Sequence, residues 1–426
     1  MDRNIVNALP ELITNGVLTE EAAANIRAYY LHKEQQQPQR MNLVFGILGA
    51  ILVGLGIILM VAHNWDTLPQ AFKLFLSFLP LLAGQLLCGY TLLKKAANKT
   101  WRESSACFLF FAVGASIALV AQVYHIPGNL ASFLLTWMLL CFPLIYILSS
   151  SMASLLYLVG ITAFAVNDGY GYQGADSFKY WWLLLLCLPH YLLLIRQQPQ
   201  SNFTLFHHWF VVASLTICLG TLASKEGLLM PVAYMTLFAV FYLLGTEPFF
   251  AARRLLANAY LVVGSLGTMF LLLMFSFKGV WSQFTFIDNN TAAPEVCGAA
   301  ISTVLAGILL YRHLRRAKAT GVNPMAFVFI AFSGVYFVGM SAPFPAVLLM
   351  NLLVLAAAIF TIHRGQQSNH LGILNYGLLI IALLVICRFF DTDLSFVLRG
   401  LMFVAVGAGF FIANNRLAKK RRQHVL

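Results

Sequence analysis

Charged side chains are scarce in this chain of 426 residues. Asp, Glu, Lys and Arg make up only 10% of the sequence, whereas 60% of the residues are hydrophobic and the mean hydropathy is +0.80. A soluble domain has about 25% charged residues, because water must hydrate its surface. The composition therefore excludes a soluble enzyme and a nucleic-acid-binding protein, and the high hydrophobicity excludes intrinsic disorder. What remains is a protein with many membrane spans, whose main partner is the lipid bilayer.

Acidic residues are the rarest charged group, with 15 Asp and Glu against 27 Lys and Arg. Each acidic residue falls in a predicted loop or at the end of an apolar run. Ionisable residues inside a bilayer indicate transport or proton relay. A carrier driven by a buried carboxylate is therefore disfavoured, while a facilitator or a histidine-based relay stays open. We assign the net charge of +12 to membrane orientation and anionic headgroups.

Motifs for catalysis and for ligand binding are also missing. The seven cysteines include no C-x-x-C pair and no Cys/His ligand spacing, so neither a disulfide framework nor a metal site is predicted. The chain has no P-loop, no G-x-S-x-G, no H-E-x-x-H and no G-x-G-x-x-G before a helix. No catalytic residue and no cofactor is predicted, and an intramembrane enzyme is the least favoured role.

Long apolar runs are what the sequence has instead. A bilayer core about 30 Å thick requires about 20 helical residues. About fourteen runs have this scale, which predicts an all-α transmembrane bundle over residues 42–413. A helical segment, residues 1–41, precedes the bundle, and a basic tail, residues 414–426, follows it. The runs lie near residues 42–63, 71–93, 105–124, 130–149, 152–167, 180–195, 207–223, 228–245, 255–276, 297–312, 325–340, 343–362, 371–389 and 395–413.

Two apolar stretches, 130–167 and 325–362, are too long for one span each. Each is predicted to fold back at a break, at Ser149–Ser151 in the first and at Ser341–Pro343 in the second. The helix count in these two stretches stays open. Ahead of the spans, Thr19 is predicted to cap a short helix whose first turn holds Glu20 and Glu21.

The positions of Lys and Arg orient the spans. With an even number of spans most basic residues fall on the side of the two termini, which is the cytoplasmic side under the positive-inside rule. Both termini are therefore predicted to be cytoplasmic. The basic residues predicted on the outer side are Lys73, Lys179, Lys225, Lys278, Arg388 and Arg399.

Polar residues gather at three outer-side turns. The first follows the span 42–63, the second follows the span 105–124, and the third connects the last two spans. The set is Asn64, Trp65, Asp66, Gln122, Tyr124, His125, Arg388, Asp391, Asp393 and Arg399. In one interpretation these residues cap helices and anchor aromatic rings at the interface. In the other they form a shallow polar recess for a lipid headgroup or a small solute.

The chain resembles a family of bacterial membrane proteins known as domain of unknown function 2157. The likeness covers roughly residues 5–150, and it rests on Thr19-Glu20-Glu21-Ala22, on Asn64-Trp65 and on Ala121-Gln122-Val123-Tyr124-His125. The closing segment, Arg388–Asp391 followed by Phe396, Arg399 and Gly400, also looks like the end of such proteins. The resemblance implies a multi-pass protein of the bacterial inner membrane and leaves its activity open.

Two roles are compatible with these features. The first is a permease or flippase-like carrier of a small solute or a lipid. The alternative is a non-transporting membrane scaffold or envelope-stress component that acts through partners. A continuous polar cavity between the helices would favour the carrier.

The distribution of basic residues gives a first testable prediction. Reporter fusions at positions 20 and 420 are expected to report the cytoplasm, because the segments on the side of the two termini together carry most of the Lys and Arg. Paired alkaline phosphatase and fluorescent-protein reporters measure this directly. A periplasmic signal from either fusion would contradict the fourteen-span arrangement with both termini in the cytoplasm.

Overall fold

The structure is a computed structural model, and it describes residues 9–36, 65–170, 178–223 and 227–391, with positions 252, 283, 285–292, 318–322 and 369 excepted, together with single positions between 397 and 411. All regular elements in this part of the chain are helices. Residues 1–76 and residues 77–426 form two compact units, which are described separately. The predicted first span, most of the last span and the basic tail lie outside the described residues.

The first unit begins with a helical hairpin. A helix over residues 9–14 ends at Gly16, whose φ of +67° reverses the chain, and α2 (Glu20–Gln36) follows. The Thr19 hydroxyl accepts a hydrogen bond from the Ala22 N–H at 3.3 Å, so the predicted cap is confirmed. A 3-10 turn, η1 (Trp65–Thr67), then leads to α4 (Gln70–Lys94).

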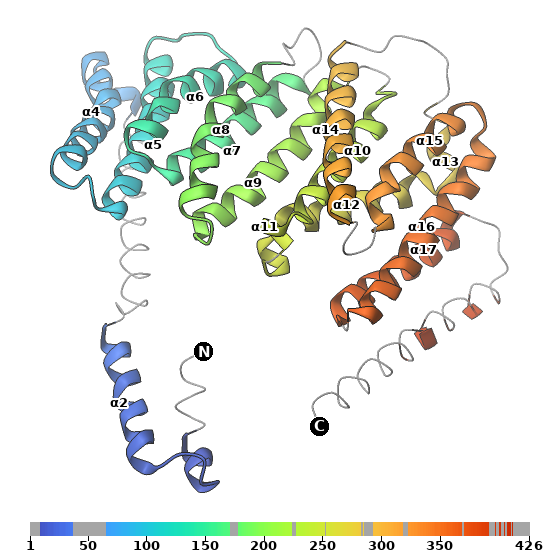
Figure 1. Cartoon of the computed structure of the whole chain (residues 1–426). Helices are drawn as coiled ribbons and strands as arrows, with labels where there is room; N and C mark the ends of the chain where they lie inside the picture. The colour runs from blue at the N-terminus through green and yellow to red at the C-terminus, as the bar shows by residue number, and fades with distance from the viewer. Residues whose placement is uncertain are drawn as a thin grey trace. The chain divides into compact units, whose positions relative to one another are not determined.

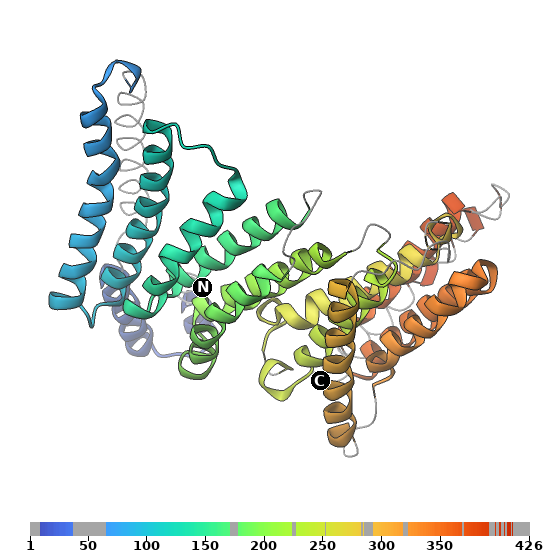
Figure 2. The same ribbon diagram turned by 90° about the horizontal axis from the view of Figure 1, so that it is seen from above.

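The second unit continues with a succession of apolar helices (Figures 1 and 2). The longer ones are α5 (Lys99–Val123), α6 (Leu130–Ile147), α7 (Ser151–Gly169), α8 (Lys179–Gln197), α9 (Asn202–Leu219), α10 (Met230–Gly245), α12 (Ala259–Phe275), α14 (Ala293–Ala317), α15 (Val328–Ser341), α16 (Pro343–Gln367) and α17 (Leu371–Asp391). The short connecting helices are η2 (Gly220–Leu222), α11 (Pro248–Ala251), η3 (Leu255–Ala257), α13 (Lys278–Trp281) and η4 (Pro324–Phe327). Every predicted span from 71–93 to 371–389 falls on one of these helices, which confirms the all-helical class.

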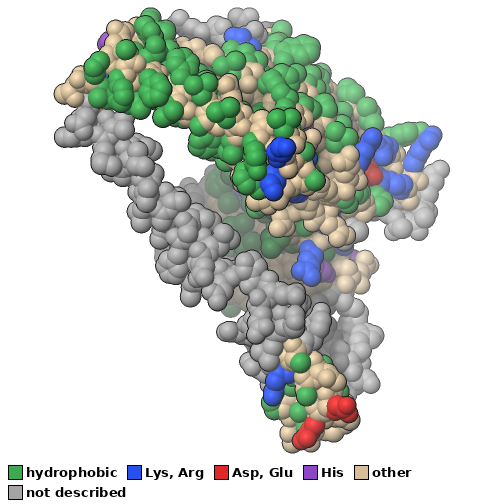
Figure 3. Space-filling model, turned by 90° about the vertical axis from the view of Figure 1, so that its left-hand side faces the viewer, with side chains coloured by type: hydrophobic (Ala, Val, Ile, Leu, Met, Phe, Trp, Pro, Cys, Tyr) green, Lys and Arg blue, Asp and Glu red, His purple; other side chains and the backbone are tan. Residues whose placement is uncertain are grey.

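Nine helices of the described part are long and apolar enough to cross a membrane, and α10 and α12 are shorter apolar helices. Hydrophobic side chains cover much of the face of residues 77–391 seen in Figure 3, where Lys and Arg gather in a few patches. Leu86, Leu93 and Trp182 are at least 70% exposed. Such a surface requires lipid rather than water around it. The count of fourteen spans and the orientation of the termini stay predictions.

Both long apolar stretches fold back where the sequence predicts. After α6, Ser149 takes a left-handed conformation with φ of +46°, and the Ser150 N–H donates to the Ile145 carbonyl at 3.1 Å. The Ser150 hydroxyl then caps α7 by accepting from the Ala153 N–H. In the second stretch, Ala342 is not helical and separates α15 from α16, and Pro343 occupies the first turn of α16. α6 packs against α7, and α15 packs against α16.

Residues 77–391 bury two hydrophobic cores. The first is built by helices from α4 to α9 around Met138, Tyr157 and Ile161. The second is built by helices from α9 to α17 around Phe275 and Phe332. α9 belongs to both cores, since its Cys218 lies in the first and its Val212 lies in the second.

Gly264 permits a close helix crossing in the second core. A Cβ atom at this position of α12 would meet the backbone nitrogen of Tyr242 and would lie 2.8 Å from the Phe238 carbonyl oxygen, both on α10. Gly307 of α14 is the matched contrast, because a Cβ there would have nothing within 4 Å.

Gly264→Ala is therefore expected to destabilise the protein by about 1–3 kcal/mol through overpacking. Gly307→Ala is expected to be neutral or slightly stabilising, because alanine is the better helix former. Unfolding in mixed detergent micelles measures both free energies. Equal effects of the two substitutions would contradict the close crossing.

Candidate functional site

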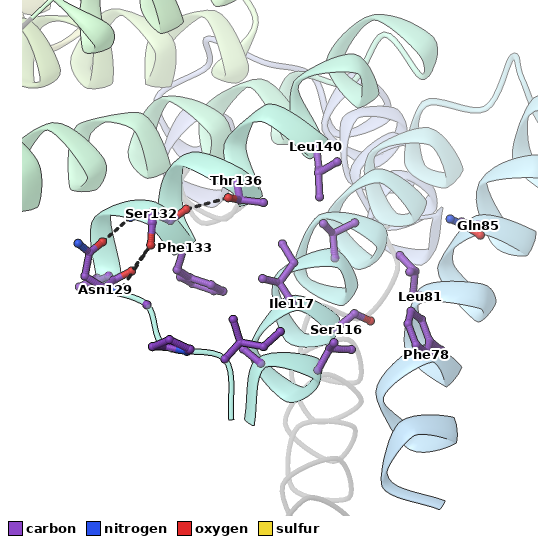
Figure 4. Close-up of a pocket in the computed structure, with 17 residues that line it drawn as sticks. Phe78, Leu81, Gln85, Ser116, Ile117, Asn129, Ser132, Phe133, Thr136 and Leu140 are labelled. Carbon is purple, nitrogen blue, oxygen red and sulfur yellow. Dashed lines mark hydrogen bonds between the residues drawn. The ribbon is translucent and has the colours of Figure 1, made fainter. Parts of the chain in front are cut away.

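A cavity of about 950 Å³ lies between α4, α5 and α6 (Figure 4). Its walls are mostly hydrocarbon, from Phe78 and Leu81 of α4, from Val113 and Ile117 of α5, and from Phe133 and Leu140 of α6. Several of these side chains are also exposed, Leu140 by 59% and Phe78 by 41%. The cavity is therefore open at its edge and is not sealed inside the core.

Uncharged polar groups interrupt the hydrocarbon walls. They are Gln85 on α4, Ser116 on α5, Asn129 in the α5–α6 turn, and Ser132 and Thr136 on α6. No charged side chain is among the lining residues that the structure describes. Binding sites for small molecules are typically apolar pockets of about 300–1,000 Å³ with a few placed polar groups. The cavity has this character.

The hydroxyl groups in the cavity are anchored to the local backbone. The Asn129 side chain accepts from the Ser132 N–H at 2.8 Å, and the Ser132 hydroxyl accepts from the Asn129 N–H at 3.3 Å, which forms a capping box at the start of α6. The Ser132 hydroxyl also donates to the Asn129 carbonyl at 2.9 Å. The Thr136 hydroxyl donates to the Ser132 carbonyl at 2.8 Å. Each hydroxyl oxygen keeps acceptor capacity for a bound molecule.

Contacts between neighbouring helices hold the three walls together. The Ser116 hydroxyl of α5 donates to the Ser77 carbonyl of α4 at 2.6 Å, one turn before Pro80. The Trp137 indole of α6 donates to the Phe110 carbonyl of α5 at 2.8 Å. These bonds satisfy polar groups that lipid leaves unpaired, so they fix the frame of the cavity.

The turn between α5 and α6 closes one end of the cavity. His125 takes the left-handed conformation with φ of +52°, and the Ile126 N–H donates to the Ala121 carbonyl at 2.9 Å. This is the Schellman arrangement, in which glycine usually occupies the position of His125. Ala121 and the residues from Ile126 to Asn129 line the cavity, whereas the side chains of Gln122, Tyr124 and His125 are exposed beside it.

The remaining residues of the predicted outer recess lie on other elements. In the first unit, Asp66 is exposed and the Trp65 ring lies 5.8 Å from the Lys73 ammonium. Arg388 of α17 donates to the Ser276 hydroxyl at 3.2 Å and lies over the Phe277 ring at 5.1 Å. Asp391 ends α17, but its side chain, like all of Asn64, Asp393 and Arg399, lies outside the described residues. The shared recess stays a prediction.

The sequence showed only part of the cavity. Gln85 was visible as a polar residue within an apolar run, and Asn129 was visible in the turn. Ser116, Ser132 and Thr136 gave no signal, because serine and threonine inside helices commonly bond to their own backbone. Among the described residues there is no group of three or more His, Cys, Asp or Glu that could hold a metal ion.

The fold and the surface define a helical membrane protein with several spans, in contact with the lipid bilayer. Within it, residues 10–154 match a family described as predicted membrane protein, domain of unknown function 2157 (DUF2157). The resemblance of the N-terminal third is therefore confirmed, and the matched segment contains every residue that lines the cavity. No curated protein and no solved structure matches the chain.

The left-handed conformation of His125 generates a stability prediction. Side chains other than glycine pay about 1–2 kcal/mol for this conformation. His125→Gly is therefore expected to raise the free energy of unfolding by roughly 1 kcal/mol, net of the greater entropy that glycine loses. Ser149→Gly, at the equivalent position after α6, is expected to act in the same direction. Thermal unfolding in detergent tests both, and a loss of stability in His125→Gly would contradict the conformational cost assigned to this position.

Proposed function

We propose that the protein is a carrier that moves an uncharged or zwitterionic lipid-like molecule across the bilayer. The observation that carries the proposal is the cavity between α4, α5 and α6. A carrier of this kind must bind a hydrocarbon chain and a polar headgroup at the same time. The cavity offers an apolar wall for the first and amide and hydroxyl groups for the second.

The chemistry of the lining groups selects the class of ligand. Phe78, Ile117 and Leu140 bind a hydrocarbon chain through the hydrophobic effect and dispersion. Gln85 and Asn129 supply amide groups that hydrogen-bond hydroxyl, ester or sugar oxygens. Because the described lining carries no charge, an anionic headgroup would be desolvated there without compensation.

The edge of the cavity supports entry from the membrane itself. Leu130, Ile126 and Leu140 line it and are each more than half exposed. A lipid chain can therefore reach the cavity sideways, without passing through water. The exposed Gln122, Tyr124 and His125 at the end of α5 belong to this proposal as headgroup contacts.

The proposal is tested by blocking the cavity. Thr136→Trp places a bulky side chain in the cavity from its α6 wall. Leu139→Trp adds the same side chain to an exposed position on α6 that does not line the cavity. In proteoliposomes that contain an NBD-labelled glycosyl diacylglycerol, the wild-type protein is expected to expose inner-leaflet label to dithionite. Thr136→Trp is expected to slow this movement roughly tenfold, the equivalent of about 1.4 kcal/mol.

Leu139→Trp serves as the control and is expected to keep the wild-type rate. NBD-labelled phosphatidylglycerol is expected to move more slowly than the glycolipid, because its headgroup is anionic. No lipid movement by the wild-type protein, correctly inserted, would overturn the carrier and favour the scaffold that acts through partners. Equal rates for the two tryptophan variants would remove the cavity from the mechanism.

A further inference from the structure

A cluster of buried histidine and tyrosine rings lies where α8, α9 and α12 meet. α8 supplies His190 and Tyr191, α9 supplies His207 and His208, and α12 supplies Tyr260. His207 and His208 are completely buried, and the other three are 5–8% exposed. None of these residues lines the cavity between α4, α5 and α6.

His208 is held in its neutral form by its neighbour. The Arg253 guanidinium, which has only donors, lies 3.2 Å from His208 Nε2, so this nitrogen accepts and carries no hydrogen. The ring hydrogen is therefore on Nδ1, which donates to the Tyr191 hydroxyl at 2.6 Å. A second hydrogen on Nε2 would point at the N–H groups of Arg253. His208 consequently has no place for a further proton.

His207 has hydrogen-bond partners in both protonation states. Its Nδ1 donates to the Phe203 carbonyl at 2.7 Å, and its Nε2 lies 3.0 Å from the Ser154 hydroxyl, which in turn lies 3.2 Å from the Cys187 sulfur. When the ring is neutral, Ser154 donates to Nε2. When the ring is charged, Nε2 donates to Ser154, and the Ser154 hydrogen turns to Cys187. The heavy atoms stay in place in either state.

His190 lies beside His207 and has one ring nitrogen, Nε2, that is open for a hydrogen bond. Its Nε2 is buried and has no hydrogen-bond partner among the described residues, although the side chain is only 8% exposed. The His190 and His207 rings are 6.2 Å apart, centre to centre, and Tyr146 meets His190 edge-on at 6.5 Å. A buried polar atom without a partner is rare in folded proteins and marks a position for a ligand or a proton.

Glu103 supplies negative charge next to the two rings. Its carboxylate accepts from the Ser150 hydroxyl at 2.5 Å and from the N–H groups of Ser151 and Met152 at 3.1 and 2.8 Å. Ser154, the partner of His207, follows Ser150 by one helical turn. Burial of the two rings opposes a charge on either of them, and the Glu103 carboxylate favours it. One added proton is partly offset by this carboxylate, whereas two charged rings at this separation would repel each other strongly in the protein interior.

We propose that His190 and His207 form a buried proton-binding site that takes up one proton between them. The site does not rest on the proposed carrier function, and it would supply the coupling ion if that function holds. The titratable groups that face the pair from the surrounding elements are Glu103 on α5, Tyr146 on α6, Tyr157 on α7, Cys187 and Tyr191 on α8, His208 on α9, Tyr260 on α12 and Arg253 in the connection before η3.

Proton counting on the full chain in nanodiscs tests the site. Potentiometric titration between about pH 8 and pH 3.5 measures the uptake of wild type, His190→Gln, His207→Gln and the double variant. Each single variant is expected to bind as many protons as wild type, because the remaining ring takes the shared proton. The double variant is expected to bind one proton fewer. His363→Gln, at an exposed position of α16, is the matched control for the loss of one imidazole away from the pair.

Two outcomes would overturn the proposal. An unchanged count in the double variant means that the pair binds no proton, and a loss of one proton in each single variant means that the rings titrate independently. The ¹⁵N imidazole spectrum of the wild-type protein provides a measurement that does not depend on the folding of any variant. One charge shared between the His190 and His207 signals is expected at the acidic end, and two charged rings, or none, would refute the site.

Discussion

Two carboxylates hold the N-termini of the helices at the centre of the two cores. Glu103 of α5 caps α7, and the completely buried Glu295 of α14 accepts from the Leu229 N–H at the start of α10. The first turn of a helix has N–H groups without internal partners, and neither lipid nor a protein core can satisfy them. A carboxylate also complements the positive end of the helix dipole. α7 packs on α5, α6, α8 and α9, while α10 packs on α12, α14 and α15, so both cores depend on these caps.

Two tyrosine hydroxyls tie the proline-containing helix α8 to its neighbours. Pro189 removes one N–H from α8, and near it the Leu186 and Leu183 carbonyls accept from the hydroxyls of Tyr146 and Tyr157. These bonds tie α8 to α6 and α7. They lie beside His190, the residue that follows the proline, and the Tyr146 ring meets the His190 ring edge-on.

The sequence predicted the helices and their breaks well, and it predicted their partners poorly. The length of apolar runs located each described span, and the serine and proline breaks located both hairpins. Which face of a helix is buried was not readable, because lipid is as apolar as the core. On α4, Leu86 is 76% exposed while Cys88 is 6% exposed, two positions apart in one apolar run. The capping of α7 by Glu103 and the contact of His190 with His207 depend on those faces, and so does the cavity.

The double membership of α9 has a mechanical consequence. It contacts α7 and α8 in the first core and α10 and α12 in the second. Since close-packed interiors shift between discrete arrangements rather than deform smoothly, a rotation of α9 must repack both bundles together. The first turns of α9 carry His207, whose Nε2 contacts Ser154 of α7. The charge on this ring therefore acts on the helix that the two cores share. A proton added to His207 can therefore affect the packing of both hydrophobic cores.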